Sequence, residues 1–542
     1  MFHRKVLNRR RFLKYAGITA AVVGASAIGF DFVLRQHPSS TNQMTSSSSS
    51  SVTPYGGLRL YFPDVPDKST SIADVVYIHV LDKNSNVIGT ISADVLGKDN
   101  RPNLKIPDDA SFLEAKMGSL PLQNAGFKEI TSDRLRMDTY LSGSVVDSLE
   151  IHPRNQIHYV RLRPNEDSDA DGIPDKNDLN PRIPEPKPIK CNYHITVGYL
   201  HGFLGYNPRD DWDNYSYHSL LGKYRAYDPQ VADWQIKWCL ENGIDTFAVF
   251  FQQFSSEPFE QTLNLEDGFL RAKYIDMIKF YANYDSYVQY SGASFQDSIK
   301  YASATINYLC ENYFDHPSYL RIGGRPILSV FNSYDYVTKF GIESFDRIIK
   351  LIRETSESNG YELYLMGDVI NSWHKYADHF AKTYDAMTGY VIADAGSSWT
   401  TDKNGYPVCV APYDLMPQGY GYECAYWYRL AKNNSKGFIP PVITGYSNLT
   451  FYEKRIDSWL VDRTYPNVAS FDKMLMAVTP YVDPELRRLF VPFNEYPENA
   501  VLEPTEEYGF SFLNSLRNRF CQEPSDGWPP NLIPTPSGIV EH

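Results

Sequence analysis

Residues 228–251 read DPQVADWQIKWCLENGIDTFAVFF. Asp228 and Pro229 are residue types that favour the N-cap and the first position of a helix, and Gly243 is the type that ends one. Residues 246–251 follow as a short apolar run, which is typical of a buried strand. The stretch therefore predicts one helix followed by one strand.

The same alternation of helical segments and short apolar runs continues from Cys191 to Cys521. Such alternation indicates β/α units that share a parallel sheet. About 330 residues with this rhythm suit a TIM-type (β/α)8 barrel with long loops. The alternative, a doubly wound open sheet, would need a Gly-rich loop after its first strand, and none is present. The expected strands are 194–200, 246–251, 326–331, 362–366, 386–390, 442–444 and 489–493.

The chain in front of the barrel differs in composition. Apolar and polar residues alternate with a period of two in residues 55–165, which predicts an all-β, sandwich-like domain. The expected division is a signal or anchor at 1–36, a Ser/Thr-rich linker at 37–54, the β-domain at 55–165, an acidic loop and Pro-rich hinge at 166–190, the barrel at 191–522 and a disordered tail at 523–542.

The N-terminus carries an export signal. Arg9 and Arg10 stand before Phe12-Leu13-Lys14, and an apolar run fills residues 15–30. This order is typical of a twin-arginine (Tat) signal, so we expect the Tat translocase as a partner and a location outside the cell or on its surface. Ala25-Ser26-Ala27 resembles a cleavage site, but apolar residues continue beyond it. Removal of the segment and its retention as a membrane anchor therefore both stay open.

Charge and cysteine content exclude several classes of protein. A net charge of -13 argues against nucleic-acid binding, which needs a basic surface. The 41 tyrosines suit sugar rings, because their faces combine apolar area with a hydrogen-bonding edge. All six cysteines follow residue 190 without the close pairing of a zinc site. Export permits disulfides, for which Cys409 with Cys424 or Cys191 with Cys521 are the candidates, and buried free thiols are the alternative.

An acidic loop occupies residues 166–178. Counted from Asp167, its carboxylates fall at the first, third, fifth, ninth and twelfth positions, with Gly at the sixth, which is the spacing that wraps oxygen ligands around Ca²⁺. The loop resembles those of thrombospondin type 3 repeats, although Asp replaces the Glu of an EF-hand at the last position. A solvated acidic linker is the alternative. The expected calcium ligands are Asp167, Asp169, Asp171, the Ile173 carbonyl, Asp175 and Asp178.

The best acid/base candidates follow the last expected strand. The segment Phe493-Asn494-Glu495-Tyr496-Pro497-Glu498 places two carboxylates three residues apart, where barrel enzymes carry their catalytic groups. Crowded carboxylates cannot both ionise freely, so one can act as an acid and the other as a base. A Glu pair on a solvated surface is the alternative. Glu503 lies close enough in sequence to add a third carboxylate.

The barrel segment resembles glycoside hydrolase family 99 and the related WbsX-like proteins. Their late-strand motif runs Asn-Glu-Trp-His-Glu-Gly-Thr and then Ile-Glu-Pro, and this chain has NEYPENA at 494–500 and Leu502-Glu503-Pro504. Tyr496-Pro497 replaces Trp-His, and Asn499-Ala500 replaces Gly-Thr. Further matches are Trp212, LGKY at 221–224, 228–247, HPSYLR at 316–321, Gly324-Arg325-Pro326, Phe438-Ile439-Pro440 and Gly445-Tyr446.

The resemblance implies a mechanism and its residues. Glu495 would be the base that deprotonates the sugar 2-hydroxyl, and Glu498 the acid that protonates the leaving oxygen. The 2-oxygen would then form an anhydrosugar that water opens with overall retention. Known members cleave endo-α-1,2 linkages in mannose-containing glycans, and catalysis needs no cofactor.

The sequence thus predicts an exported glycoside hydrolase acting on oligo- or polysaccharides. Two alternatives stay open: a non-catalytic glycan-binding protein of the cell envelope, and a WbsX-like protein of surface polysaccharide metabolism. The expected substrate-binding residues are Tyr199, His201, Trp212, Asn494, Tyr496 and Glu503.

Overall fold

The structure is a computed structural model of the 542-residue chain. It describes residues 183–200, 215–224, 228–252, 268–285, 294–372, 374–392, 415–447 and 468–534, the single positions 169, 171, 173, 174, 180, 212, 226, 265, 266 and 395, and the strands of 59–159 and 398–463 by their backbone. The predicted Tat signal and the Ser/Thr-rich linker lie outside these residues.

Eight parallel strands close into a barrel, which confirms the predicted (β/α)8 class. Their order around the barrel is β18-β15-β14-β13-β11-β10-β9-β21. The ring closes because Val442 N donates to Phe490 O (2.9 Å) and Phe490 N donates to Pro440 O (3.1 Å). The strands are β9 His194–Tyr199, β10 Thr246–Gln252, β11 Lys279–Asp285, β13 Arg325–Val330, β14 Tyr364–Asp368, β15 Ala386–Thr388, β18 Gly437–Phe438 and β21 Arg488–Pro492.

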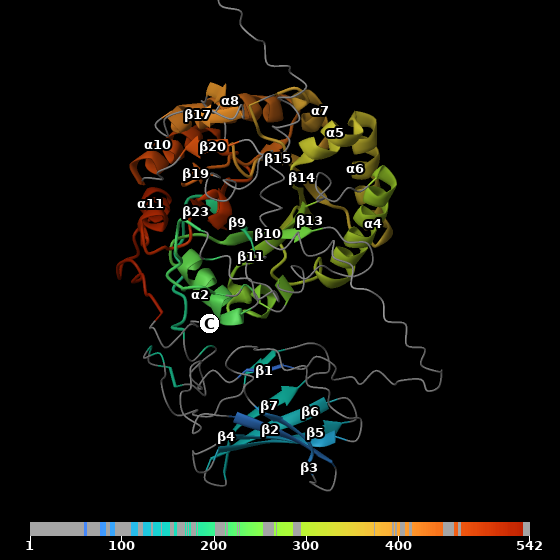
Figure 1. The fold of residues 1–542 in the computed structure, drawn as a ribbon, viewed down its shortest axis with the longest axis vertical. Coiled ribbons are helices and arrows are strands. Elements are labelled where there is room, and N and C mark those ends of the chain that lie inside the picture. The colour runs from blue at the N-terminus through green and yellow to red at the C-terminus, as the bar shows by residue number, and fades with distance from the viewer. Residues whose placement is uncertain are drawn as a thin grey trace, which may run out of the picture.

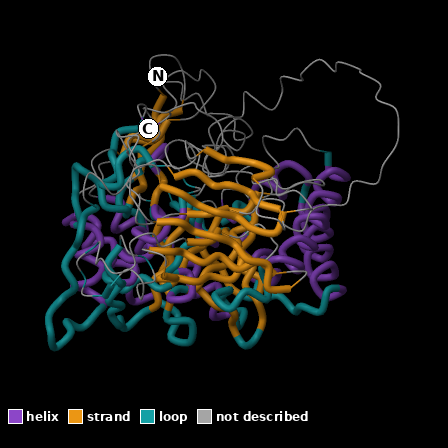
Figure 2. Tube along the Cα trace, turned by 90° about the horizontal axis from the view of Figure 1, so that it is seen from below, coloured by secondary structure: helices purple, strands orange, loops and turns teal. Residues whose placement is uncertain are grey.

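Helices surround these strands, as Figures 1 and 2 show. The helices are α2 Pro229–Leu240, α4 Phe295–Asn312, α5 Ser333–Phe340, α6 Ile342–Ser358, α7 Ala377–Thr383, α8 Met416–Asn433, α10 Val468–Val478 and α11 Ser511–Phe520. Short 3-10 turns are η4 Phe269–Arg271, η5 Ile275–Met277, η7 Thr479–Tyr481 and η8 Tyr496–Glu498.

Helix α2 follows the sequence closely. Asp228 is its N-cap and accepts a hydrogen bond from Gln230 N at 2.9 Å, with Pro229 in the first turn. All twelve residues of the helix are buried, Gln235 and Lys237 included. The helix therefore lies between the barrel on one side and further chain on the other, and both sides are anchored by polar contacts described below.

Two barrel strands differ from the sequence prediction. Strand β11 was not among the expected strands, because its sequence, KFYANYD, mixes tyrosines with polar residues instead of forming an apolar run. No strand is assigned at 442–444, and the barrel strand of this part of the chain is β18, Gly437–Phe438. Val442 instead belongs to the segment that completes the barrel against Phe490.

Smaller strands decorate the barrel. A four-stranded sheet of order β16-β17-β20-β19 is inserted in the late loops and was not predicted. Strand β12 pairs with β13, and β22 forms a hairpin with β23 after β21. Their bounds are β12 Arg321–Ile322, β16 Ser398–Thr401, β17 Pro407–Val410, β19 Tyr446–Ser447, β20 Leu460–Arg463, β22 Asn494–Glu495 and β23 Ala500–Val501.

The described N-terminal strands have the predicted all-β character. Six of them form an antiparallel sheet of order β3-β2-β4-β5-β6-β7, and β1 pairs in parallel with β8 (Figure 1). Their bounds are β1 Arg59–Tyr61, β2 Val76–Asp82, β3 Val87–Ser92, β4 Ala110–Met117, β5 Gln123–Thr131, β6 Arg134–Leu141, β7 Ser144–Ile151 and β8 Ile157–Tyr159.

Residues 523–534 are the described part of the C-terminal tail. Residues 523–534 were expected to belong to a disordered tail, yet Trp238 Nε1 of α2 donates to Leu532 O at 2.8 Å. Arg517 of α11 lies over the Trp528 ring at 5.0 Å. These contacts hold the first half of the tail against the barrel. Among the described residues, no helix has the length and apolar composition of a membrane span.

A disulfide joins Cys191, just before β9, to Cys521, just after α11. Gly243 lies against it with φ +81°, and a Cβ at this position would clash with Cys191 Sγ. Glycine is thus required here both by its backbone conformation and by space. Cys424 is a buried free thiol, so the alternative pairing with Cys409 is not formed.

Replacing Cys191 and Cys521 by serine is expected to lower the free energy of unfolding by about 2–5 kcal/mol. The cross-link closes a loop with a sequence separation of 330 residues, so its loss frees the unfolded chain. Urea unfolding with and without a reductant measures this. The reductant should destabilise the wild type and leave the double variant unchanged, and equal stability of both proteins would contradict the expectation.

Candidate active site

A layer of aromatic rings fills the barrel below the carboxyl ends of its strands. Phe250 packs against Phe331 and Tyr390 with ring centroids 4.9 and 5.2 Å apart, and Tyr390 lies 5.6 Å from Phe490. Gly198 of β9 makes room for them, because a Cβ there would come within 2.7 Å of the Tyr390 ring. The carboxylates of the site lie next to this aromatic layer, and Tyr390 of the layer contacts one of them.

Glu495 is held by the hydroxyl of Tyr390, a residue of the aromatic layer. It lies in β22, directly after β21, and its side chain is 0% exposed. Tyr390 OH donates to Glu495 Oε2 at 3.1 Å. Burial raises the pKa of Tyr390 well above its usual range, and the charges of Glu495 and Glu498 add to this. Tyr390 therefore stays a hydrogen-bond donor that supports negative charge on Glu495.

Glu498 differs from Glu495 in its hydrogen bonding. The 3-10 turn η8 carries it beneath the surface, and Asn499 completes the turn with φ +56° while its side chain donates to Ser447 O at 3.1 Å. Neither carboxyl oxygen of Glu498 has a hydrogen-bond partner of normal geometry. Burial raises the pKa of Glu498 to about 8, against a smaller opposing effect of the Tyr446 hydroxyl. At neutral pH Glu498 is therefore mainly a neutral acid.

Glu503 is a third buried carboxylate, and it is fully engaged. Burial raises its pKa to about 7, although four donors surround it. The donors come from a loop, from helix α2 and from η8, so Glu503 ties three segments together beneath the catalytic candidates. They are Ser219 Oγ (3.3 Å), Tyr224 OH (2.9 Å), Gln235 Nε2 (2.9 Å) and Tyr496 OH (2.9 Å).

Three other expected substrate-binding residues, Tyr199, Trp212 and Asn494, are buried around the same site. Tyr199 OH donates to Gln235 Oε1 at 2.7 Å, and Trp212 Nε1 donates to Tyr224 O at 3.1 Å. The Asn494 amide donates to Leu200 O and accepts from Leu200 N, both at 2.8 Å. The polar atoms of these three side chains therefore bind other protein groups around the glutamates. His201 lies outside the described residues.

Comparison with known proteins identifies the family. A family model described as Glycosyltransferase WbsX matches residues 217–516, which is more than half of the chain. The chain belongs to the WbsX family. No curated protein matches the chain.

Several solved structures are similar to this WbsX-family chain. A glycoside hydrolase-like protein is 18% identical, with a TM-score of 0.43 over 63% of this chain and 98% of that one. The GH99 endo-alpha-mannosidase from Bacteroides thetaiotaomicron is 16% identical, with a TM-score of 0.41 over 60% and 95% of the two chains. Its complex with BIS-TRIS-propane is 18% identical at the same score and coverage.

Sequence reasoning missed polar residues on the other side of the WbsX-family barrel mouth. Asp285 ends the unpredicted strand β11, Asp368 ends β14, and Asp335 lies in the first turn of α5. Asp368 accepts from Tyr390 N at 3.1 Å. An Asp at the end of a strand is the sequence signal that could have indicated Asp285 and Asp368. Neither Asp285 nor Tyr390 belongs to a recognisable motif.

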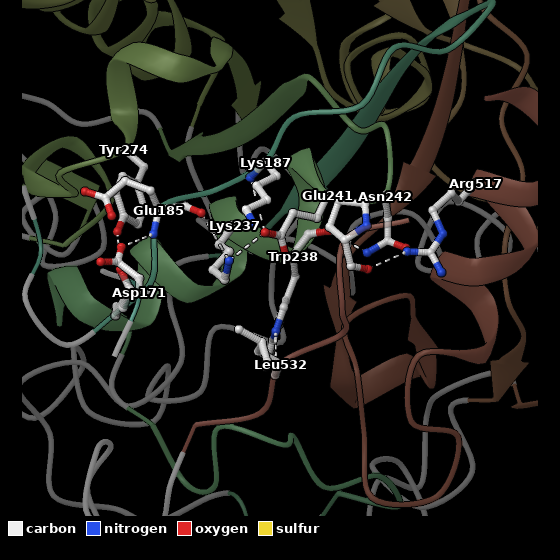
Figure 3. A network of polar contacts seen from close by, with 12 residues as sticks. Asp171, Glu185, Lys187, Lys237, Trp238, Glu241, Asn242, Tyr274, Arg517 and Leu532 are labelled. Carbon is white, nitrogen blue, oxygen red and sulfur yellow. Dashed lines mark hydrogen bonds and ion pairs between the residues drawn. The ribbon is translucent and has the colours of Figure 1, made fainter. Parts of the chain in front are cut away.

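The acidic loop approaches the barrel at α2 (Figure 3). Asp171 accepts from Ile173 N (2.8 Å) and Glu185 N (3.4 Å), and Asp169 accepts from Asp171 N (3.2 Å). Lys237 of α2 donates to Glu185 O at 3.5 Å. The described residues contain no group of three acidic, His or Cys side chains that could hold a metal ion. Asp167, Asp175 and Asp178 lie outside the described residues.

Proposed function

We propose that this WbsX-family protein hydrolyses α-linked glycans with retention, using Glu498 as the acid and Glu495 as the base. The observation that carries the proposal is the contrast between the two glutamates. Glu498 is buried without a hydrogen bond of normal geometry and has a pKa of about 8, whereas Glu495 accepts a hydrogen bond from Tyr390. Two carboxyl groups whose environments differ in this way can divide acid and base roles between them.

In the proposed reaction, Glu495 takes the proton of the substrate 2-hydroxyl. The 2-oxygen attacks the anomeric carbon, the glycosidic bond breaks, and Glu498 gives its proton to the leaving oxygen. Water then attacks the anhydrosugar and transfers its proton to Glu498, while the 2-oxygen recovers a proton from Glu495. Both residues return to their starting states. Specificity for endo-α-1,2 linkages of mannose-containing glycans belongs to this proposal.

The family description favours a second candidate, transfer of a glycosyl group. A nucleotide-sugar donor would bring a diphosphate, which basic side chains normally bind. The described groups at the barrel mouth are instead acidic: Glu495, Glu498, Asp285, Asp335 and Asp368. We therefore place hydrolysis first.

Incubation of the full chain with a panel of α-linked oligosaccharides and α-mannans tests the proposal. Hydrolysis predicts new reducing ends in water without any added acceptor. Product that forms only with a nucleotide-sugar donor and an acceptor would support transfer. If the folded wild type binds glycans but forms no product, both hydrolysis and glycosyl transfer are contradicted. That result would favour a non-catalytic glycan-binding protein.

The rate of hydrolysis should fall as the pH rises through about 8, because Glu498 must hold its proton to act as an acid and burial raises its pKa to about 8. Initial rates between pH 5 and 10 measure this. A rate that stays constant to pH 10 would remove Glu498 from the acid role.

We also propose that the chain is exported through the Tat pathway and that residues 167–178 bind Ca²⁺. The Asp169 and Asp171 carboxylates already turn this loop by accepting from backbone N–H groups two residues on. Export would place the loop and the carboxylate pair where polymeric glycans and abundant calcium occur together.

Calcium is expected to raise the melting temperature of the full chain, because Asp171 contacts Glu185, which is held by Lys237 of α2. Calorimetric titration with Ca²⁺ measures the binding itself. The variant Asp169→Ala/Asp171→Ala should bind no calcium and show no shift in melting temperature. Heat of binding that persists in this variant would contradict the loop assignment.

A further inference from the structure

The four-stranded sheet inserted in the late loops reaches the proposed acid at two neighbouring residues. These are Tyr446 and Ser447, which form strand β19, pair antiparallel with β20 and are 0% and 2% exposed. On the other side are Glu498 and Asn499 at the end of η8, both buried as well. The inserted sheet thus places two buried residues beside the turn that carries the acid.

Asn499 makes the first contact between η8 and β19. Its side-chain Nδ2 donates to Ser447 O at 3.1 Å. Its backbone lies in the left-handed region, with φ 56°, which Asn tolerates better than most residue types. Because Asn499 directly follows Glu498, this bond keeps the acid next to β19.

Tyr446 makes the second contact, with the acid itself. Its hydroxyl faces the Glu498 carboxyl as a hydrogen-bond donor, although the contact lacks the geometry of a normal hydrogen bond. Tyr390 contacts Glu495 in a similar way, at 3.1 Å and with normal geometry. Each glutamate of the pair therefore has a tyrosine hydroxyl beside it, and the one beside the acid comes from the inserted sheet.

A donor beside a protonated carboxyl group decides where its proton points. Such a group has one O–H donor and one oxygen that only accepts. The Tyr446 hydroxyl takes the accepting oxygen, so the O–H of Glu498 is left for another acceptor. In the proposed reaction that acceptor is the glycosidic oxygen. Catalytic hydrogen bonds are often poorly aligned before the substrate binds and become well aligned in the complex.

We propose that Tyr446 is a positioning residue for the proton donor. Its hydroxyl binds one oxygen of Glu498 and turns the other, which carries the proton, toward the leaving oxygen. Tyr446 keeps its own proton throughout, and no bond to it is made or broken apart from the hydrogen bond. The inserted sheet is then a part of the active site. The role of Tyr446 rests on the proposed function, which makes Glu498 the acid.

Loss of the Tyr446 hydroxyl has an effect of known sign. Burial raises the pKa of Glu498 to about 8, and the hydroxyl opposes this because it stabilises the charged carboxylate. Tyr446→Phe should therefore raise the pKa of Glu498 further, by roughly one pH unit, the size expected from losing one hydrogen bond to a charged group.

The kinetics of Tyr446→Phe should show the same shift. The alkaline limb of kcat should move to higher pH with the pKa of Glu498. At pH 6, kcat should fall about tenfold because the proton is less well aimed. KM should change little, because Tyr446 has no exposed surface with which to bind substrate.

The deciding test titrates Glu498 directly in the full chain, without substrate. Infrared difference spectra between pH 6 and 10 follow the C=O stretch of the protonated carboxyl group, and the Glu498→Gln variant identifies its band. The midpoint should be higher in Tyr446→Phe than in the wild type. It should stay unchanged in Tyr422→Phe, the matched control, since Tyr422 is 65% exposed on α8. An unchanged midpoint in folded Tyr446→Phe would overturn the proposal.

Asn499→Gly is a second variant, which decides even where Tyr446→Phe fails to fold. Glycine accepts φ 56° and removes the donor to Ser447 O, so η8 is released from β19 and the midpoint should rise as well. A raised midpoint in a protein that cleaves no glycan would refute the proposed function and leave the contact between Tyr446 and Glu498 established. Cleavage with a midpoint and an alkaline limb that neither variant moves would refute the role of Tyr446 alone.

Discussion

Glu498→Gln is expected to lower kcat on α-linked oligosaccharides by about 10²–10⁴-fold, because the amide cannot donate a proton to the leaving oxygen. An aryl α-glycoside with an acidic phenol as leaving group needs little protonation, so the loss on this substrate should be much smaller. Initial rates on both substrates measure the difference. Glu495→Gln is the matched variant, and it should lose activity on both because the 2-hydroxyl still has to be deprotonated.

Glu498→Gln should also stabilise the folded protein. The pKa of Glu498 is raised in the folded state, so the unfolded chain releases this proton first and stability is lost as the pH rises toward 8. Glutamine removes that penalty. A higher melting temperature of Glu498→Gln at pH 8, with no gain at pH 4, would separate loss of catalysis from loss of folding. A variant that melts earlier at both pH values would contradict this account of the site.

Glu503→Ala is expected to lower the free energy of unfolding by about 3–5 kcal/mol, since it leaves several buried donors without an acceptor. The carboxylate accepts from Ser219, Tyr224, Gln235 and Tyr496, which come from three separate segments. Urea unfolding measures the loss.

Glu506→Ala is the matched control, because Glu506 is exposed three residues further along the same chain segment. It should change the free energy of unfolding by less than about 0.5 kcal/mol. Equal effects of the two substitutions would show that the four hydrogen bonds of Glu503 do not hold the site together. Preserved stability with lost glycan binding would return Glu503 to the substrate-binding role predicted from the sequence.

The barrel could be predicted because each β/α unit carries local signals. Asp228, Pro229 and Gly243 mark the two ends of α2, and the apolar run that follows is β10. Strand β11 gave no such signal, because its inward side chains include Tyr281, Asn283 and Asp285. Polar residues inside a barrel serve the site, and they break the apolar pattern by which strands are recognised.

The glutamate pair could be predicted from its place after the last strand, and the family resemblance assigned the base role to Glu495 and the acid role to Glu498. The spacing of the two glutamates alone does not distinguish them. The fold adds the physical difference, because it brings Tyr390, more than 100 residues away, onto Glu495 and leaves Glu498 without a hydrogen bond of normal geometry. Likewise, Tyr199 and Trp212 were expected to stack on a sugar, yet both side chains are buried and their polar atoms bind other parts of the protein.

The most direct test of the central claim is the configuration of the first product. Proton NMR of a fresh reaction with an α-1,2-linked mannose oligosaccharide resolves the anomeric proton before mutarotation. Hydrolysis by the Glu495/Glu498 pair through the 2-oxygen predicts that the α-anomer appears first and that Glu498→Gln forms it about 10²–10⁴-fold more slowly at the same enzyme concentration. A β-anomer as first product, or no product from folded wild-type protein on any α-linked glycan, would contradict it.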